Sequence, residues 1–78
     1  VANPLRGAAQ VRFSTETAQD VRLALYDVLG REVAVVAQGA AAGAQSATLQ
    51  TAGLAPGVYV LRLTAGADVL TQTVTVIR

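Results

Sequence analysis

Short runs of alternating apolar and polar residues, separated by glycine and proline, dominate this sequence. A period of two is the spacing of side chains along a β-strand, whereas an amphipathic helix needs a spacing near 3.6. No stretch of the chain sustains the helical spacing. The pattern therefore predicts an all-β, antiparallel fold without a helix.

We expect six or seven short strands, each ended by a turn. The predicted ranges are Gln10–Phe13, Val21–Tyr26, Glu32–Ala37, Ser46–Gln50, Val58–Thr64 and Val69–Ile77. The segment Gln38–Gly43 is expected to be a loop, because two glycines within six positions disfavour a helix. Strands of this number and length are typical of an antiparallel β-sandwich.

The alternation also predicts which side chains enter the core. Val21, Leu23 and Leu25 share one face of their strand, and Val33 and Val35 are expected to face inward from the next one. Further predicted core residues are Phe13, Tyr59, Leu61, Leu63, Val74 and Val76, with Arg62 pointing away. Aromatic residues make up only 4% of the chain, so Val and Leu must supply most of the core volume.

Several residues are assigned to turn geometry. Gly30 is expected to adopt a positive φ in a hairpin turn, and Pro56-Gly57 marks a second turn. Asp27 is predicted to bond the backbone of its own turn. Tyr59 follows the second turn, and its hydroxyl is predicted to bond back to the backbone as a corner tyrosine.

Length and charge narrow the functional classes. The chain has 78 residues, enough for one domain spanning residues 1–78, and its net charge of +1 does not favour nucleic acid or an anionic membrane. Val1–Pro4 lacks the features of a signal peptide, and Val1 is not an initiator methionine, so a longer parent protein is expected. Its apolar stretches are far shorter than the roughly 18–20 residues of a membrane helix.

The side chains that carry most enzyme chemistry are missing. His, Cys and Lys are absent, which removes the usual base, thiolate, Schiff-base amine and zinc ligands. The five acids are Glu16, Asp20, Asp27, Glu32 and Asp68, and they lie mostly at expected strand ends and turns. No loop clusters acids for calcium, and the glycines form no phosphate-binding pattern. We therefore expect no enzyme activity, no metal and no cofactor.

Carbohydrate binding is an alternative, because small β-sandwiches often accompany polysaccharide-degrading enzymes. Sugar recognition relies on exposed aromatic platforms, and this chain has no Trp. Phe13 and Tyr59 are assigned to the structure of the domain, which leaves Tyr26 as a single candidate platform. An inert spacer domain is a further alternative.

An ordered set of segments resembles a known family. It comprises Asn3-Pro4, then Tyr26–Val33 (YDVLGREV), then Leu54–Leu63 (LAPGVYVLRL) and the terminal Val76-Ile77-Arg78. In this order and spacing the segments resemble the C-terminal sorting domain of the type IX secretion system of Bacteroidota-type bacteria. The resemblance runs across essentially the whole chain.

The resemblance implies an Ig-like sandwich of about seven strands that serves as an address label on a secreted protein. Such a label is read as a folded domain by the outer-membrane translocon, after the cargo has crossed the periplasm. A sortase-like peptidase commonly removes it, here upstream of Asn3, and the cargo ends at the cell surface or outside the cell. One departure is that Thr71-Gln72-Thr73 stands where family members often carry Lys.

The expected recognition elements are the last strand with its chain end and the turns around Gly30 and Gly57. Arg78, Ile77 and Val76 are the candidate recognition residues, because a terminal strand can offer an edge for strand addition. For Val74 and Val76 the favoured explanation is that they complete the core, because burial explains alternating aliphatic residues. Gly30, Pro56, Gly57 and Tyr59 are expected to act through the fold.

Overall fold

The computed structural model describes residues 5–77, apart from the side chain of Glu16. These residues form four strands and no helix: β1 (Ala8–Asp27), β2 (Glu32–Gln50), β3 (Gly57–Ala65) and β4 (Asp68–Val76). All strand pairs are antiparallel, and the sheet order is β2-β1-β3-β4. The prediction of an all-β antiparallel fold is confirmed. Nothing between residues 5 and 77 is a helix able to span a membrane.

The strand count was wrong. The strands expected at Gln10–Phe13 and Val21–Tyr26 are one continuous β1, and those expected at Glu32–Ala37 and Ser46–Gln50 are one continuous β2. The segment Gln38–Gly43, expected to be a loop, lies inside β2. Gly39 and Gly43 have φ angles of 122° and 71° there, so glycine lets the strand bend without ending it. One curled sheet of four strands takes the place of the expected seven-stranded sandwich.

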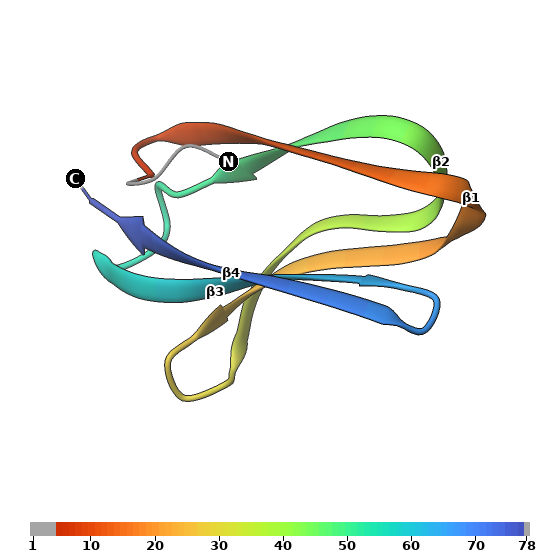
Figure 1. Ribbon diagram of the computed structural model, residues 1–78. Coiled ribbons are helices and arrows are strands. Elements are labelled where there is room, and N and C mark those ends of the chain that lie inside the picture. The colour runs from red at the N-terminus through yellow and green to blue at the C-terminus, as the bar shows by residue number, and fades with distance from the viewer. Residues whose placement is uncertain (1–4, 78) are drawn as a thin grey trace.

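A bulge makes the long β1–β2 hairpin curl over itself. Thr15 pairs with Gly43 and Gln19 with Ala41, so residues 16–18 of β1 lie opposite residue 42 alone. Bulges of this kind bend a strand and increase its twist. In Figure 1 the first half of β1 and the second half of β2 lie above the other halves, which continue the sheet with β3 and β4.

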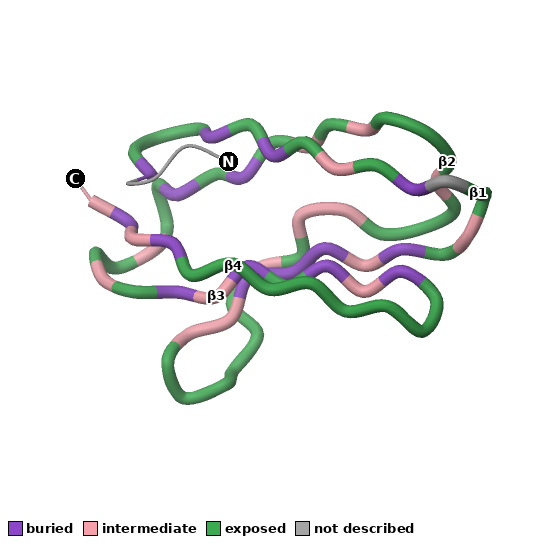
Figure 2. Tube along the Cα trace, viewed as in Figure 1, coloured by how far each residue is buried: buried purple, intermediate pink, exposed green. Residues whose placement is uncertain are grey.

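The core fills the space between these two layers. Buried residues alternate with exposed ones along the facing strands, as the period of two requires (Figure 2). The upper layer and the segment before it contribute Leu5, Ala9, Val11 and Leu49, and the lower layer contributes Val21, Leu23, Leu25, Tyr59, Leu61, Leu63, Ala65, Val74 and Val76. Phe13 is half-buried and packs against this cluster.

Most predicted core faces are confirmed, and one is wrong. Val33 and Val35 are exposed, whereas Ala34 and Val36 pack against the core. The register explains the reversal, because Ala34 pairs with the buried Leu25. Irregular pairing on both sides of this position breaks the simple alternation, and a shift of one residue moves a side chain to the other face.

Candidate recognition surface

Two of the predicted recognition residues, Val76 and Ile77, lie beside Leu5, the first described residue of the chain. The Ile77 amide donates to Leu5 O at 2.9 Å, and the Leu5 amide donates to Thr75 O at 2.6 Å. Val76 is 2% exposed, so its side chain belongs to the core, and Ile77 is half-buried. Leu5 therefore covers the outer edge of β4 at residues 75–77. Arg78 lies outside the described residues.

The rest of β4 is an edge strand without the usual protection. From Val69 to Ile77 the sequence carries no charge, and β4 pairs with β3 without a register shift. Natural edge strands are commonly blunted by charges, proline or bulges, because an unpaired edge accepts a further strand. Between Val69 and Val74, β4 therefore offers a regular backbone edge without charged side chains.

The inner face of β4 is also partly open. Leu70 pairs with the core residue Leu63, yet Leu70 is 66% exposed. The upper layer does not cover this end of the strand, and a hollow of about 290 Å³ lies between β1 and β4, lined by Phe13, Leu61 and Leu70 among others. The sheet is thus a curled half-barrel that is incompletely closed along β4.

The residues assigned to turns are placed as follows. The Tyr59 hydroxyl donates to Ala55 O at 2.6 Å, which is the backbone bond expected of a corner tyrosine. Pro56 is exposed in the loop, and Gly57 begins β3 opposite Val76. These residues hold the loop between β2 and β3 against the end of β4.

Gly30 and Asp27 build the turn of the β1–β2 hairpin. Gly30 has a φ of 82°, and its amide donates to Asp27 O at 3.0 Å. Asp27 Oδ1 accepts from the amides of Leu29 and Arg31, both at 2.9 Å, as predicted for this residue. The amide and the guanidinium of Arg31, together with the Leu29 amide, hold the pKa of the Asp27 carboxyl below its ordinary value.

Tyr26 is engaged by two arginines, which the sequence analysis missed. Arg22 Nη1 donates to the Tyr26 hydroxyl at 3.3 Å, and the Arg62 guanidinium lies 6.0 Å from the ring centroid. Arg22 also forms an ion pair with Glu32, and the hydrogen bond to that carboxylate raises the pKa of Arg22. The period of two could have indicated the pair, since Arg22 and Tyr26 share the face of β1 opposite to the core.

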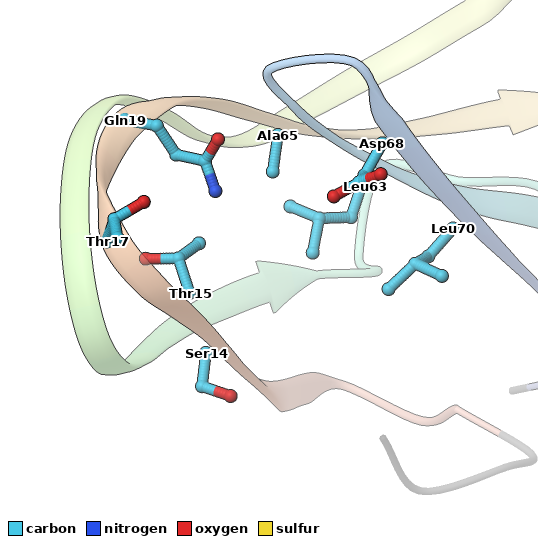
Figure 3. Close-up of a pocket in the computed structure, with 8 residues that line it drawn as sticks. All are labelled: Ser14, Thr15, Thr17, Gln19, Leu63, Ala65, Asp68 and Leu70. Carbon is cyan, nitrogen blue, oxygen red and sulfur yellow. The ribbon is translucent and has the colours of Figure 1, made fainter.

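A polar hollow lies where β1 bends beside the β3–β4 turn (Figure 3). Its volume is about 460 Å³, and its lining consists of Ser14, Thr15, Thr17, Gln19, Leu63, Ala65, Asp68 and Leu70. Thr15 donates its hydroxyl to Ala41 O at 3.2 Å, so that group stabilises the bend. Among the lining residues that the structure describes, Asp68 is the single ionisable one.

Comparison with known proteins assigns the family. The family of secretion system C-terminal sorting domains matches residues 2–77, which include all four strands. Neither a curated protein nor a solved structure matches this chain. Because the match covers nearly the whole sequence, the chain belongs to the family of type IX secretion system C-terminal sorting domains.

Proposed function

We propose that this chain is the non-catalytic export label of a larger secreted protein of a Bacteroidota-type bacterium. The outer-membrane type IX translocon reads residues 1–78 as one folded domain attached to N-terminal cargo. The cargo passes through the periplasm and reaches the cell surface or the medium, and a sortase-like peptidase cuts upstream of Asn3. The observation that carries this proposal is the family match over residues 2–77.

The backbone edge of β4 supports recognition by strand addition. The edge is regular, it carries no charge after Asp68, and Leu5 covers it at residues 75–77. A translocon strand would therefore pair with the part of β4 before Thr75, while Ile77 and Arg78 flank it. Val76 would contribute to recognition by stabilising the core, and its buried side chain would not contact the translocon.

Two features favour an export label over a sugar-binding module. The Tyr26 ring has Arg62 over it and Arg22 on its hydroxyl, so it is not a free platform for a pyranose. Tyr59 is buried and bonds the backbone through its hydroxyl. The described aromatic residues are thus engaged within the fold.

A reporter fusion tests the proposal. Val1–Arg78 is placed behind a signal peptide, a linker and a fluorescent protein in a bacterium with a working type IX system, and a second fusion lacks Val69–Arg78. Both fusions are repeated in a strain without the translocon. We expect extracellular reporter only with the full domain and a working translocon. Reporter retained in the periplasm in every case, with the domain folded, would refute the proposal and leave a spacer or a binding module.

A further inference from the structure

The tip of the β1–β2 hairpin presents two aliphatic side chains to solvent. Val28 is 72% exposed and Leu29 is 74% exposed, the highest values among the large hydrophobic residues that the structure describes as exposed. The tip extends beyond the body of the molecule as the yellow loop at the bottom of Figure 1, and Figure 2 colours it as exposed. Burial within this domain does not explain these two residues.

Turn geometry does not explain them either. Asp27 occupies the first position of the turn and Gly30 the fourth, where Asp and Gly are favoured. Gly30 supplies the positive φ, as in a three-residue hairpin loop. Val28 and Leu29 hold the two central positions, which tolerate most residues, including polar ones that would cost nothing in water.

The tip is held in one conformation before any partner arrives. The amides of Asp27, Leu29, Gly30 and Arg31 all have partners within the loop, at 2.9–3.0 Å. Arg31 Nε adds a bond to Asp27 Oδ2 at 2.8 Å. A preformed loop loses little conformational entropy on binding, so its exposed side chains can act as anchors.

We propose that Val28 and Leu29 form an anchor that inserts into an apolar pocket on a protein of the export machinery. This inference rests on the proposed function and adds a second contact, away from the edge of β4. The ion pairs of Arg31 with Asp27 and of Arg22 with Glu32 cancel within the domain, which leaves Arg62 over the Tyr26 ring as a single positive charge near the tip and not the cluster of basic residues that binds anionic lipid. The two anchor positions carry no aromatic ring of the kind that favours a membrane interface. A protein pocket therefore fits this tip better than a bilayer does.

The test compares two variants of the fluorescent reporter fusion. The anchor variant carries Val28→Ser and Leu29→Ser. The control variant carries Val35→Thr and Val58→Thr, which removes two exposed aliphatic side chains, 46% and 48% exposed, from β2 and β3. Urea unfolding of both purified variants is measured beside the wild type. We expect unchanged unfolding midpoints and a loss of export of at least about tenfold for the anchor variant alone.

Each other outcome has a defined meaning. Unchanged export of the anchor variant, or an equal loss in the control, overturns the anchor while the export label stands. Failure of the wild-type fusion to leave the cell overturns the export label itself. Co-sedimentation of the wild-type domain, but not the anchor variant, with phosphatidylethanolamine–phosphatidylglycerol vesicles also overturns the protein pocket, because the tip would then bind lipid.

Discussion

Substituting each of the two tyrosines by Phe removes the same hydroxyl group from two different environments. Tyr59 is 8% exposed and donates to Ala55 O at 2.6 Å, whereas Tyr26 is half-buried and receives a hydrogen bond from Arg22 at 3.3 Å. We predict that Tyr59→Phe destabilises the domain more than Tyr26→Phe does.

The magnitude follows from the surroundings of each hydroxyl. A hydrogen bond in a folded protein contributes about 0.5–1.5 kcal/mol net, and the short bond of Tyr59 lies in the upper part of that range. Ala55 is exposed, so water can satisfy its carbonyl in the variant and no buried unpaired group adds to the cost. We therefore expect a loss of about 1 kcal/mol for Tyr59→Phe, and less than about 0.5 kcal/mol for Tyr26→Phe.

Urea unfolding followed by far-ultraviolet circular dichroism measures both losses. For a domain of this size, about 1 kcal/mol corresponds to a fall in Tm of roughly 4–8 °C. The slope of the urea transition should not change, because the surface exposed on unfolding is the same. Equal stability of Tyr59→Phe and the wild type, or a larger loss for Tyr26→Phe, would refute the corner-tyrosine assignment.

Three further predictions follow from the core and the hairpin turn. Leu25→Ala should lower the free energy of unfolding by about 2–5 kcal/mol, because Leu25 is 0% exposed, and urea unfolding would contradict this if the loss were below 1 kcal/mol. Gly30→Ala should lower the free energy of unfolding by about 1–2 kcal/mol, because Gly30 has a φ of 82°, and Gly30→Asn should lower it clearly less. Equal losses for the two variants would refute the explanation by positive φ. The free energy of unfolding should fall as the pH drops from the ordinary pKa of Asp27 through its lowered pKa in the folded state. The reason is that the Asp27 carboxylate accepts hydrogen bonds in the folded turn, and protonation weakens these bonds. An NMR titration of the Asp27 carboxyl with an ordinary pKa would contradict this.

The sequence contained enough to predict the strand faces but not the strand ends. The period of two placed Leu23, Leu25, Tyr59 and Leu61 correctly in the core, because regular pairing keeps alternate residues on one face. Gly39 was interpreted as part of a loop, although a glycine can equally bend a strand. The choice depends on pairing with β1, which is a long-range contact that local sequence does not encode.

The candidate recognition surface was predictable only where it depends on local sequence. The turn role of Asp27 and Gly30 follows from local sequence, because each acts on its own backbone. The exposure of Val28 and Leu29 follows once the turn is placed at Asp27–Gly30. The contact of Leu5 with β4 joins the two ends of the described chain, and no local pattern predicts it.

The central claim is that export depends on this domain in its folded form. The most direct test measures extracellular reporter from the fusion carrying Leu25→Asp, which buries an unpaired charge in the core and unfolds the domain. Gln50→Asp is the matched control, because it adds the same charge at an exposed position of β2. With full-length reporter verified by immunoblot, we predict export of the wild type and Gln50→Asp, and retention of Leu25→Asp in the periplasm. Equal export of all three fusions would contradict the claim, because an unfolded segment would then suffice.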